Sequence, residues 1–419
     1  MEETRLVPKR RFQSFREEWE QNKLDNLLEQ LKDGTHGTHR NVEKGPYLLS
    51  AKNIKNGEIF ISEEDRNISV EEYEKIHKYF SLKKGDVLLT IVGSIGESAI
   101  IDNPYGYTFQ RSVAYLRPNK EINSKFLYAQ INSYEFQKKL MNRQVLSAQA
   151  GIYLRDLSDI FITFPTIEEQ QKIGEFFKVL DECIANQERK IAKVKALKAA
   201  YLTEMFPQKG ETVPKRRFKG YEDEWGQSYL LDNIKKIIDF RGRTPKKLGL
   251  SWSENGYLAL SALNVKNGYI DYTVEPHYGD EELYYKWMSG NELKKNQVIF
   301  TTEAPMGNVA QVPDNKGYIL SQRVIVFDCY EERISNDFLA VLLRSSNINK
   351  KLTNLSSGGT AKGVSQKTLE SLKVKAPSLK EQQKIGNFFK NLDNQIETEE
   401  KKLDKLQKMK EAYLEEMFV

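Results

Sequence analysis

The chain has little or nothing of several features on which specialised proteins depend. Among its 419 residues are only two cysteines, Cys183 and Cys329, which form no CxxC pair. They indicate neither a zinc site nor a disulfide framework, so a reducing cytoplasm is the expected compartment. No run of eighteen apolar residues is present, and the opening MEETRLVPKRR lacks an apolar signal core. We therefore expect a soluble protein without a membrane span.

Motifs of DNA-modifying enzymes are also missing. The chain has no Pro-Pro dipeptide, so the Asn/Asp-Pro-Pro-aromatic motif of amino-methyltransferases is absent. VPDNK at 312–316 contains an aspartate without spaced acidic partners and is a weak match to a nuclease motif. The four histidines and the two cysteines form no nucleophilic set that repeats. His36 and His39 have no third ligand nearby in the sequence. We predict no catalytic residue, no metal site and no cofactor in this chain.

What the sequence does contain is a long internal repeat. EQQKIG occurs at 169–174 and again at 381–386, and residues 168–206 match 380–418 at 22 of 39 ungapped positions. VPKRRF at 7–12 returns at 213–218, and NIKNG at 53–57 returns as NVKNG at 264–268. The offset between copies drifts only from 206 to 212 residues. The period is a whole domain, so the chain is a tandem duplication and not a solenoid.

The repeated segments 168–206 and 380–418 have the heptad spacing of long helices. Apolar residues recur every three or four positions, from Ile173 to Met205 in the first copy and from Ile385 to Met417 in the second. A helix of this length is stabilised by burying its apolar stripe, and the obvious partner is the other copy. We predict an antiparallel coiled coil. One register, offered as a hypothesis, pairs Gln187 with Lys410 and Lys198 with Glu399.

Other apolar residues lie outside this seam and predict a second contact surface. The surface could face the globular parts of the same chain or another subunit, and the sequence does not decide between them. The residues proposed for a subunit contact are Phe176, Leu202, Phe206, Phe388, Leu414 and Phe418.

The segments before the helices are predicted to be mixed α and β structure. Strands are expected at 85–93, 112–118, 296–304 and 324–328, which are rich in β-branched and aromatic residues. Helices are expected at 125–140 and 337–352. The fold class is therefore α+β: two mixed domains in tandem, each followed by a long helix. The predicted boundaries are 1–166 and 208–376 for the domains, and 167–207 and 377–419 for the helices.

The net charge of +5 is modest, so any argument for nucleic-acid binding must rest on where the charge lies. Residues 235–247, KKIIDFRGRTPKK, contain six basic residues and one acid. The equivalent place in the first unit is DGTHGTHR, 33–40. Polar donor residues on a loop suit contact with phosphates or base edges. A solvated basic loop is the alternative, but the occurrence of such loops in both units favours a functional role.

Two further short motifs recur in both units. The NIKNG and NVKNG turns carry lysine and asparagine, and Gln110-Arg111 matches Gln322-Arg323. Arginine and glutamine make bidentate contacts with bases, although they also make structural hydrogen bonds. The turns could likewise be simple hairpins. The predicted DNA-binding residues are Thr35, His36, Arg40, Lys52, Asn53, Lys55, Gln110, Arg111, Arg241, Arg243, Lys246, Lys247, Asn264, Lys266, Gln322 and Arg323.

Taken together, these features resemble the specificity subunit of type I restriction-modification systems. The resemblance covers essentially the whole chain. It is carried by the VPKRRF openings followed by Trp19 and Trp225, by DGTH at 33–36, by GTAKGVSQKTL at 359–369, and above all by the two EQQKIG helix starts, each preceded by a proline and continued by FF-x2-LD. The first unit departs from the GT-K-G form, with SAQAGIYLRDL at 147–157, and the second has DFRGRTP in place of DGTH.

The resemblance implies a non-enzymatic subunit with two target-recognition domains, each contacting one half of a bipartite DNA site. The two helices would set the gap between the half-sites. The family's partners are double-stranded DNA, two methyltransferase subunits and two restriction subunits, which use S-adenosylmethionine, ATP and Mg²⁺. Such a subunit works in the bacterial cytoplasm, associated with the nucleoid when bound to DNA.

Two alternatives stay open at the level of sequence. One is a stand-alone DNA methyltransferase or nuclease with cryptic motifs, which the missing Pro-Pro dipeptide disfavours. The other is a coiled-coil scaffold without DNA specificity. A scaffold would not need two divergent globular units with donor-rich loops.

Overall fold

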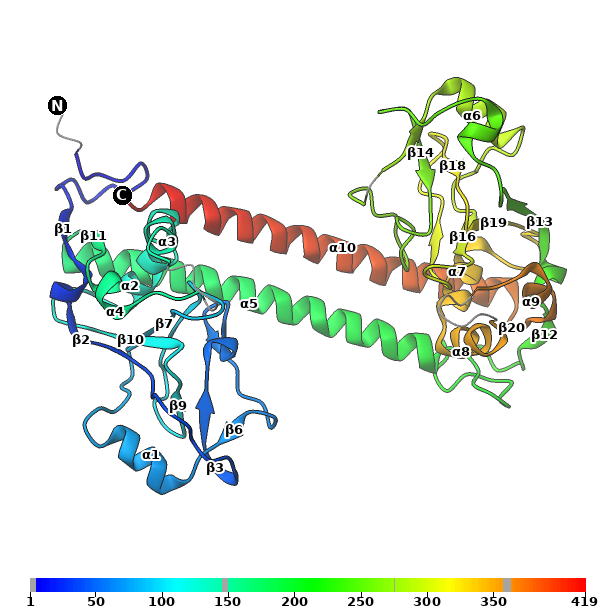
Figure 1. The fold of residues 1–419 in the computed structure, drawn as a ribbon. Helices are drawn as coiled ribbons and strands as arrows, with labels where there is room; N and C mark the ends of the chain where they lie inside the picture. The colour runs from blue at the N-terminus through cyan, green and yellow to red at the C-terminus, as the bar shows by residue number, and fades with distance from the viewer. Residues whose placement is uncertain (1–4, 145–149, 275, 357–362) are drawn as a thin grey trace. The chain divides into compact units, whose positions relative to one another are not determined.

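The protein folds into two compact units, and both long helices contribute to each of them (Figure 1). The computed structural model describes residues 5–144, 150–274, 276–356 and 363–419. Unit 1 comprises residues 1–188 and 401–419, and unit 2 comprises residues 189–400. Each unit thus combines a globular segment with the start of one helix and the end of the other. The predicted boundaries, which separate globular segments from helices, stay a prediction.

The two long helices lie where the heptad pattern predicts them. Helix α5 spans Ile167–Glu204 and helix α10 spans Leu379–Glu416. Each follows a proline, Pro165 or Pro377, by two residues, and each has glutamate in its first turn. Proline disfavours helix before this point, and acidic residues complement the positive end of the helix dipole. The helix prediction is confirmed.

Unit 1 is built on a four-stranded antiparallel sheet in the order β2-β10-β7-β8. A three-stranded sheet, β6-β3-β9, pairs β3 with β9 in parallel, and two ribbons, β1-β11 and β4-β5, complete the unit. The strands are β1 (Glu20–Lys23), β2 (Leu28–Asp33), β3 (Val42–Leu49), β4 (Ile54–Lys55), β5 (Glu58–Ile59), β6 (Arg66–Asn67), β7 (Val87–Thr90), β8 (Ser98–Ile100), β9 (Tyr107–Phe109), β10 (Val113–Pro118) and β11 (Phe161–Phe164).

Unit 2 repeats this topology, except that an isolated bridge between Val265 and Ile270 takes the place of the ribbon β4-β5. Its sheets have the orders β13-β19-β16-β17 and β15-β14-β18, with the ribbon β12-β20, and β14 pairs with β18 in parallel. The strands are β12 (Gly226–Tyr229), β13 (Ile234–Asp239), β14 (Tyr257–Leu260), β15 (Tyr278–Gly279), β16 (Val298–Thr301), β17 (Val309–Gln311), β18 (Ile319–Leu320), β19 (Val324–Cys329) and β20 (Lys373–Ala376). The predicted strands are confirmed, and the duplication extends to the fold of segments that share few residues.

The predicted helices at 125–140 and 337–352 are each two helices. Residues 125–140 form α2 (Ser124–Ile131) and α3 (Tyr134–Met141), and 337–352 form α7 (Asn336–Arg344) and α8 (Ser346–Leu355). The breaks fall at Ser133 and Ser345, whose hydroxyls donate to the carbonyls of Gln130 and Leu342. Serine competes in this way with the helical backbone and favours caps, which the apolar pattern does not reveal. The remaining helices are α1 (Val70–His77), α4 (Leu154–Ser158), α6 (Glu281–Met288) and α9 (Gln366–Ser371).

Within each unit the two long helices pair in antiparallel fashion, as predicted. In unit 1, Phe176 packs on Tyr413 with ring centroids 5.0 Å apart. In unit 2, Tyr201 packs on Phe388 with centroids 5.1 Å apart. These contacts join the start of one helix to the end of the other.

The proposed register is wrong by roughly one heptad. Lys198 pairs with Asp393 and not with Glu399, whose carboxylate lies 2.8 Å from Lys190 Nζ. Lys410 pairs with Asp181, with 2.6 Å between Nζ and Oδ1. The aromatic contacts Phe176–Tyr413 and Tyr201–Phe388 belong to the same register as these ion pairs. Charge and aromatic contacts therefore agree on the observed register.

The repeated VPKRRF segment fastens the two helices to each other within a unit. In unit 1, Arg11 makes a bidentate pair with Glu169 at the start of α5, with both N–O distances 2.7 Å. The neighbouring Arg10 pairs with Glu416 at the end of α10. The Arg11 side chain is one-tenth exposed and that of Glu169 is fully buried, and the hydrogen bonds that Arg11 donates to Glu169 raise the pKa of Arg11 above its ordinary value.

Unit 2 has the same arrangement. Arg217 pairs with Glu381 at the start of α10, at 2.7 and 2.8 Å, and Arg216 pairs with Glu204 at the end of α5. We call these two sets of contacts the arginine junctions.

The rest of EQQKIG is explained by packing inside the unit. The side-chain amide of Gln170 donates to the carbonyls of Glu121 and Pro165 and accepts from the N–H of Asn123. Gln382 makes the matching contacts in unit 2. A Cβ on Gly174 would lie 2.7 Å from Lys125 Cβ, and one on Gly386 would lie 2.7 Å from Asp337 Cβ. The motif is repeated because each helix start fits closely against its own domain.

Candidate nucleic-acid interface

In unit 1, three of the donor-rich segments named above lie side by side. Thr35, after β2, forms a parallel bridge with Gln110, and the N–H of Arg111 donates to the Thr35 carbonyl at 3.1 Å. The turn after β3 joins them, because the N–H of Ala51 donates to Ser112 Oγ at 3.0 Å. Residues 33–40, 50–55 and 110–112 therefore form one surface, which we call loop cluster 1.

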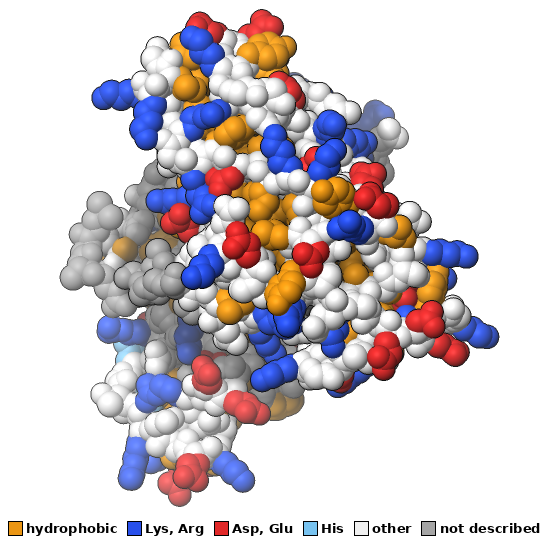
Figure 2. Space-filling view, turned by 90° about the vertical axis from the view of Figure 1, so that its right-hand side faces the viewer, with side chains coloured by type: hydrophobic (Ala, Val, Ile, Leu, Met, Phe, Trp, Pro, Cys, Tyr) orange, Lys and Arg blue, Asp and Glu red, His pale blue; other side chains and the backbone are white. Residues whose placement is uncertain are grey.

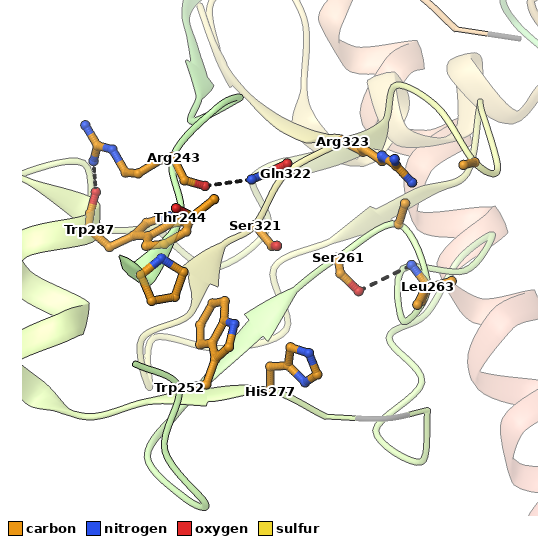
Figure 3. A pocket seen from close by; sticks show the side chains of 13 residues that line it. Arg243, Thr244, Trp252, Ser261, Leu263, His277, Trp287, Ser321, Gln322 and Arg323 are labelled. Atoms are coloured by element: carbon orange, nitrogen blue, oxygen red, sulfur yellow. Dashed lines mark hydrogen bonds between the residues drawn. The ribbon is translucent and has the colours of Figure 1, made fainter. Parts of the chain in front are cut away.

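Unit 2 brings the equivalent segments together. The side-chain amide of Gln322 donates to the Arg243 carbonyl at 2.9 Å, and the N–H of Ser321 donates to the Leu260 carbonyl at 2.9 Å. Residues 241–247, 261–266 and 321–323 form loop cluster 2. These segments border a cavity of about 440 Å³ (Figure 3). The lining combines apolar side chains with polar ones: Pro245, Trp252, Ala262, Leu263, Trp287 and Ala304 with Arg243, Thr244, Ser261, His277, Ser321, Gln322 and Arg323.

Some of the predicted DNA-binding side chains are held by neighbours. Lys52 Nζ lies 2.8 Å from Asp65 Oδ1, and this hydrogen bond holds the pKa of Asp65 well below its usual range. The Arg243 guanidinium donates to the Trp287 carbonyl and stacks over the Phe240 ring. Arg241 pairs with Asp239, and Lys247 donates to the Gly242 carbonyl. Contact with DNA would compete with these interactions.

Other basic side chains make no side-chain hydrogen bond or ion pair with any residue that the structure describes. All are exposed except Lys266, which is half-buried: Arg40, Lys55, Arg111, Lys246, Lys266 and Arg323. The predicted match of Gln110-Arg111 with Gln322-Arg323 is wrong by one residue, because the strand pairs Leu49–Phe109 and Leu260–Leu320 make Arg111 equivalent to Gln322 and Ser112 equivalent to Arg323. Arg323 also has a positive φ of 65°, a backbone conformation that a residue with a side chain seldom adopts. These six side chains are available for an anionic ligand.

Two predicted contacts are corrected by burial. Asn53 and Asn264 are only 4% and 2% exposed. Asn53 accepts from the N–H of Ser50 and donates to the Phe60 carbonyl and Asp65. Asn264 accepts from the N–H of Ser261 and donates to the Ala259 carbonyl. Both amides hold their own turn, as the hairpin interpretation of NIKNG and NVKNG supposes, and neither side chain can reach DNA in this conformation.

The two histidines of loop cluster 1 bind carboxylates. His36 Nε2 lies 2.6 Å from Asp33 Oδ2, and His39 Nδ1 lies 2.7 Å from Glu72 Oε1. Over the described ranges, no group of three or more His, Cys, Asp or Glu side chains is arranged to hold a metal ion. His36 is exposed on the loop, where it can still donate to a ligand.

Charge is dispersed over the face of the protein that Figure 2 shows. In the face drawn in Figure 2, lysine and arginine side chains alternate with acidic ones and do not gather in a single patch. The net charge alone therefore says little about a binding site, and the loop clusters carry the argument.

Comparison with known proteins identifies the family. The sequence model of the type I restriction modification DNA specificity domain matches residues 16–196 and, a second time, residues 226–408. The chain belongs to this family. The two matches fall on the two copies of the internal repeat.

Named relatives of this chain are specificity subunits of type I restriction enzymes. The chain is 23% identical over 412 residues to a putative type I restriction enzyme MjaX specificity subunit of Methanocaldococcus jannaschii, covering 95% of this chain and 92% of that protein. It is 26% identical over 229 residues to the type I restriction enzyme EcoBI specificity subunit of Escherichia coli, covering 53% and 48%. The S subunit of a type I restriction-modification system from M. genitalium shares the fold, with a TM-score of 0.62, 16% identity and 99% coverage of both chains.

The second apolar stripe of the long helices packs against the cores of the two units. Phe206 and Phe418 are 1% and 5% exposed and lie in the cores of unit 2 and unit 1. Phe176, Leu202, Phe388 and Leu414 pack against the same cores while partly exposed. The stripe thus packs against the chain's own domains, one of the two alternatives considered. Their contact with another subunit stays a prediction, and for Phe206 and Phe418 it would require the core to open.

No pattern in the sequence predicts the aromatic lining of the cavity. Trp252, Trp287 and His277 come from different segments, and Trp252 lies 5.6 Å from each of the other two rings. Trp287 is buried and donates from its indole nitrogen to the Leu320 carbonyl at 2.8 Å. No local pattern marks residues that only the fold brings together.

Two of the motifs that were compared with the family lie partly outside the described residues. In GTAKGVSQKTL the structure describes only residues 363–369, and in SAQAGIYLRDL only residues 150–157. None of the described helices is long and apolar enough to span a membrane.

Proposed function

We propose that this chain is the sequence-specific DNA-binding subunit of a type I restriction-modification complex and recognises a bipartite target. Loop cluster 1 would contact one half-site and loop cluster 2 the other. The observation that carries the proposal is the convergence, in both units, of the same three segments with unpaired basic and polar side chains. One fold with two different sets of exposed residues suits recognition of two different base sequences.

The proposed chemistry of this chain is binding alone. Methyl transfer and cleavage would belong to two methyltransferase and two restriction subunits, which would supply the sites for S-adenosylmethionine, ATP and Mg²⁺. The chain itself would need no cofactor and would act in the cytoplasm. Its contribution is to place the partner subunits at one DNA sequence.

The test is to express the chain with its cognate methyltransferase subunit in a host that lacks DNA methylation. Modified adenines are then mapped across the genome by single-molecule sequencing. We expect one bipartite motif with a modified adenine in each half, on opposite strands. A stable complex that yields no motif would refute the proposal and favour the scaffold alternative. A methyl-transfer assay on the chain alone addresses the stand-alone enzyme, and we expect no transfer.

A further inference from the structure

One exposed position differs within a turn that is otherwise the same in both units. The turn reads SAKNIKNG at 50–57 and SALNVKNG at 261–268. The serine backbone and the asparagine amide close it in both copies, with Asn Oδ1 accepting from the serine N–H at 3.0 Å in unit 1 and 2.8 Å in unit 2. Ile54 and Val265, which also differ, are both buried. The turn therefore presents Lys52 in one unit and Leu263 in the other.

Leu263 is an unusual residue for a solvent-facing turn. It is 55% exposed, although removing a leucine side chain from water lowers the free energy. It lines the cavity of loop cluster 2 together with Gln322 and Arg323 (Figure 3). In unit 1 the matched side chain is a lysine whose ammonium is 2.8 Å from Asp65. The two turns thus present side chains of different chemistry at the same position of the fold.

In the major groove of DNA, the C5 methyl of thymine is the only apolar group on a base edge, and apolar side chains contact it. Resting on the proposed function, we propose that Leu263 is a specificity-determining residue of unit 2. It contacts the C5 methyl of a thymine in the half-site that unit 2 recognises. Lys52 occupies the corresponding place in unit 1 and donates to a base acceptor in the other half-site, as lysine does to guanine O6 or N7.

The inference is tested with the complex of the full chain and its methyltransferase subunit, once the motif of the wild type has been mapped. If no motif exists, the proposed function fails and the inference with it. If a motif exists, Leu263→Lys should change one position in one half only, and Lys52→Leu should change one position in the other half only. These reciprocal variants serve as matched controls, because both side chains are exposed and neither fills a core.

A chemical probe separates methyl contact from other causes. Oligonucleotide targets are made in which one thymine at a time is replaced by deoxyuridine, which lacks only the methyl group. One replacement in the half-site of unit 2 should weaken binding by the wild-type complex about fourfold, the factor expected for burying one methyl-sized group. The Leu263→Ala complex should be indifferent to that replacement.

Two results would overturn the inference while leaving the proposed function intact. The first is a motif that stays unchanged in Leu263→Lys. The second is equal tolerance of deoxyuridine by the wild type and by Leu263→Ala at every thymine.

Discussion

The arginine junctions and the loop clusters are both present twice, but they have diverged to very different extents. Arg10, Arg11 and Glu169 of unit 1 are matched by Arg216, Arg217 and Glu381 of unit 2, with nearly the same distances. The loop clusters keep the backbone contacts between their segments but differ in most exposed side chains. The inner pairs of the junctions, Arg11–Glu169 and Arg217–Glu381, are nearly buried and constrained by packing, whereas the exposed loop residues are not. The comparison places the stabilising contacts in the repeated part and the candidate recognition residues in the divergent part.

The largest effect is expected from breaking one junction. Glu169→Ala would leave Arg11 buried without its partner, at a cost of about 3–5 kcal/mol in the free energy of unfolding. Glu381→Ala should cost about the same in unit 2. Chemical denaturation with hydrogen exchange resolved by segment measures both. Replacing Arg11 and Glu169 together by leucine should restore most of the loss, and a single variant without effect would show that the junction is dispensable.

A smaller loss is expected from filling the close contact at the helix start. Gly174→Ala places a methyl group 2.7 Å from Lys125 Cβ, and overpacking of this kind costs about 1–3 kcal/mol. Gly386→Ala meets Asp337 Cβ at the same distance and should behave alike. Thermal unfolding compares them with Gly210→Ala, where a Cβ meets no atom within 4 Å but the positive φ of 89° adds strain of its own. Helix-start variants as stable as the wild type would contradict the packing argument.

In the loop clusters the same kind of substitution should leave folding intact and change binding. Arg323→Ala is expected to weaken specific DNA binding by the complex by about 1–3 kcal/mol if the guanidinium contacts a base. A phosphate contact would instead weaken binding to all sequences and reduce the salt dependence by one charge. Titrations at several salt concentrations, with Arg111→Ala as the comparison in loop cluster 1, distinguish the two. An unchanged affinity for Arg323→Ala would remove this residue from the interface.

The register can be checked by exchanging charges. Asp181→Lys and Lys410→Asp should each destabilise unit 1 by about 0.5–1 kcal/mol, and the double variant should recover part of the loss. Exchanging Lys198 with Glu399 should give no such recovery, because Lys198 pairs with Asp393. Urea denaturation at low ionic strength is the measurement, and recovery in the second pair alone would restore the register expected from sequence.

The smallest effect is expected from the pH dependence that His77 gives to the stability of unit 1. Burial lowers the pKa of His77 from its ordinary 6.5, and its Nδ1–H donates to the Phe80 carbonyl. As pH falls below about 6.5, the unfolded state takes up a proton before the folded state does, so unit 1 should lose stability. His77→Phe should remove this pH dependence between pH 7 and the lowered pKa. Urea midpoints at a series of pH values test it, and an equal slope in the variant would exclude His77 as the cause.

Sequence patterns predicted the long helices, the strands and the duplication because each has a local or repeated signature. The heptad spacing identified Ile173 and Phe177 as seam residues, and both are buried. Local patterns failed where the outcome depended on competition between contacts. Charge pairing with Glu399 suggested one register, whereas in the structure Lys198 pairs with Asp393 and Phe176 packs on Tyr413.

The site was predictable as a set of segments but not as a set of contacts. The sequence identified the loops that meet in each unit, and Arg111 and Arg323 are exposed as a ligand contact requires. It could not distinguish them from Asn53 and Asn264, because no sequence signal separates an asparagine that closes a turn from one that binds DNA. It also could not assemble the aromatic cavity, whose residues are joined only by tertiary structure.

The placement of Phe418 has a consequence for biosynthesis. This ring packs on Trp19, Phe126 and Phe177, so the core of unit 1 is completed by residues that are made after all of unit 2. At roughly 5–20 residues per second, the ribosome needs on the order of 10–40 s to travel from residue 188 to residue 401. During that interval the apolar surface that Phe418 will cover is open to solvent and to chaperones. Unit 2 can therefore complete its core first, and the core of unit 1 closes after it.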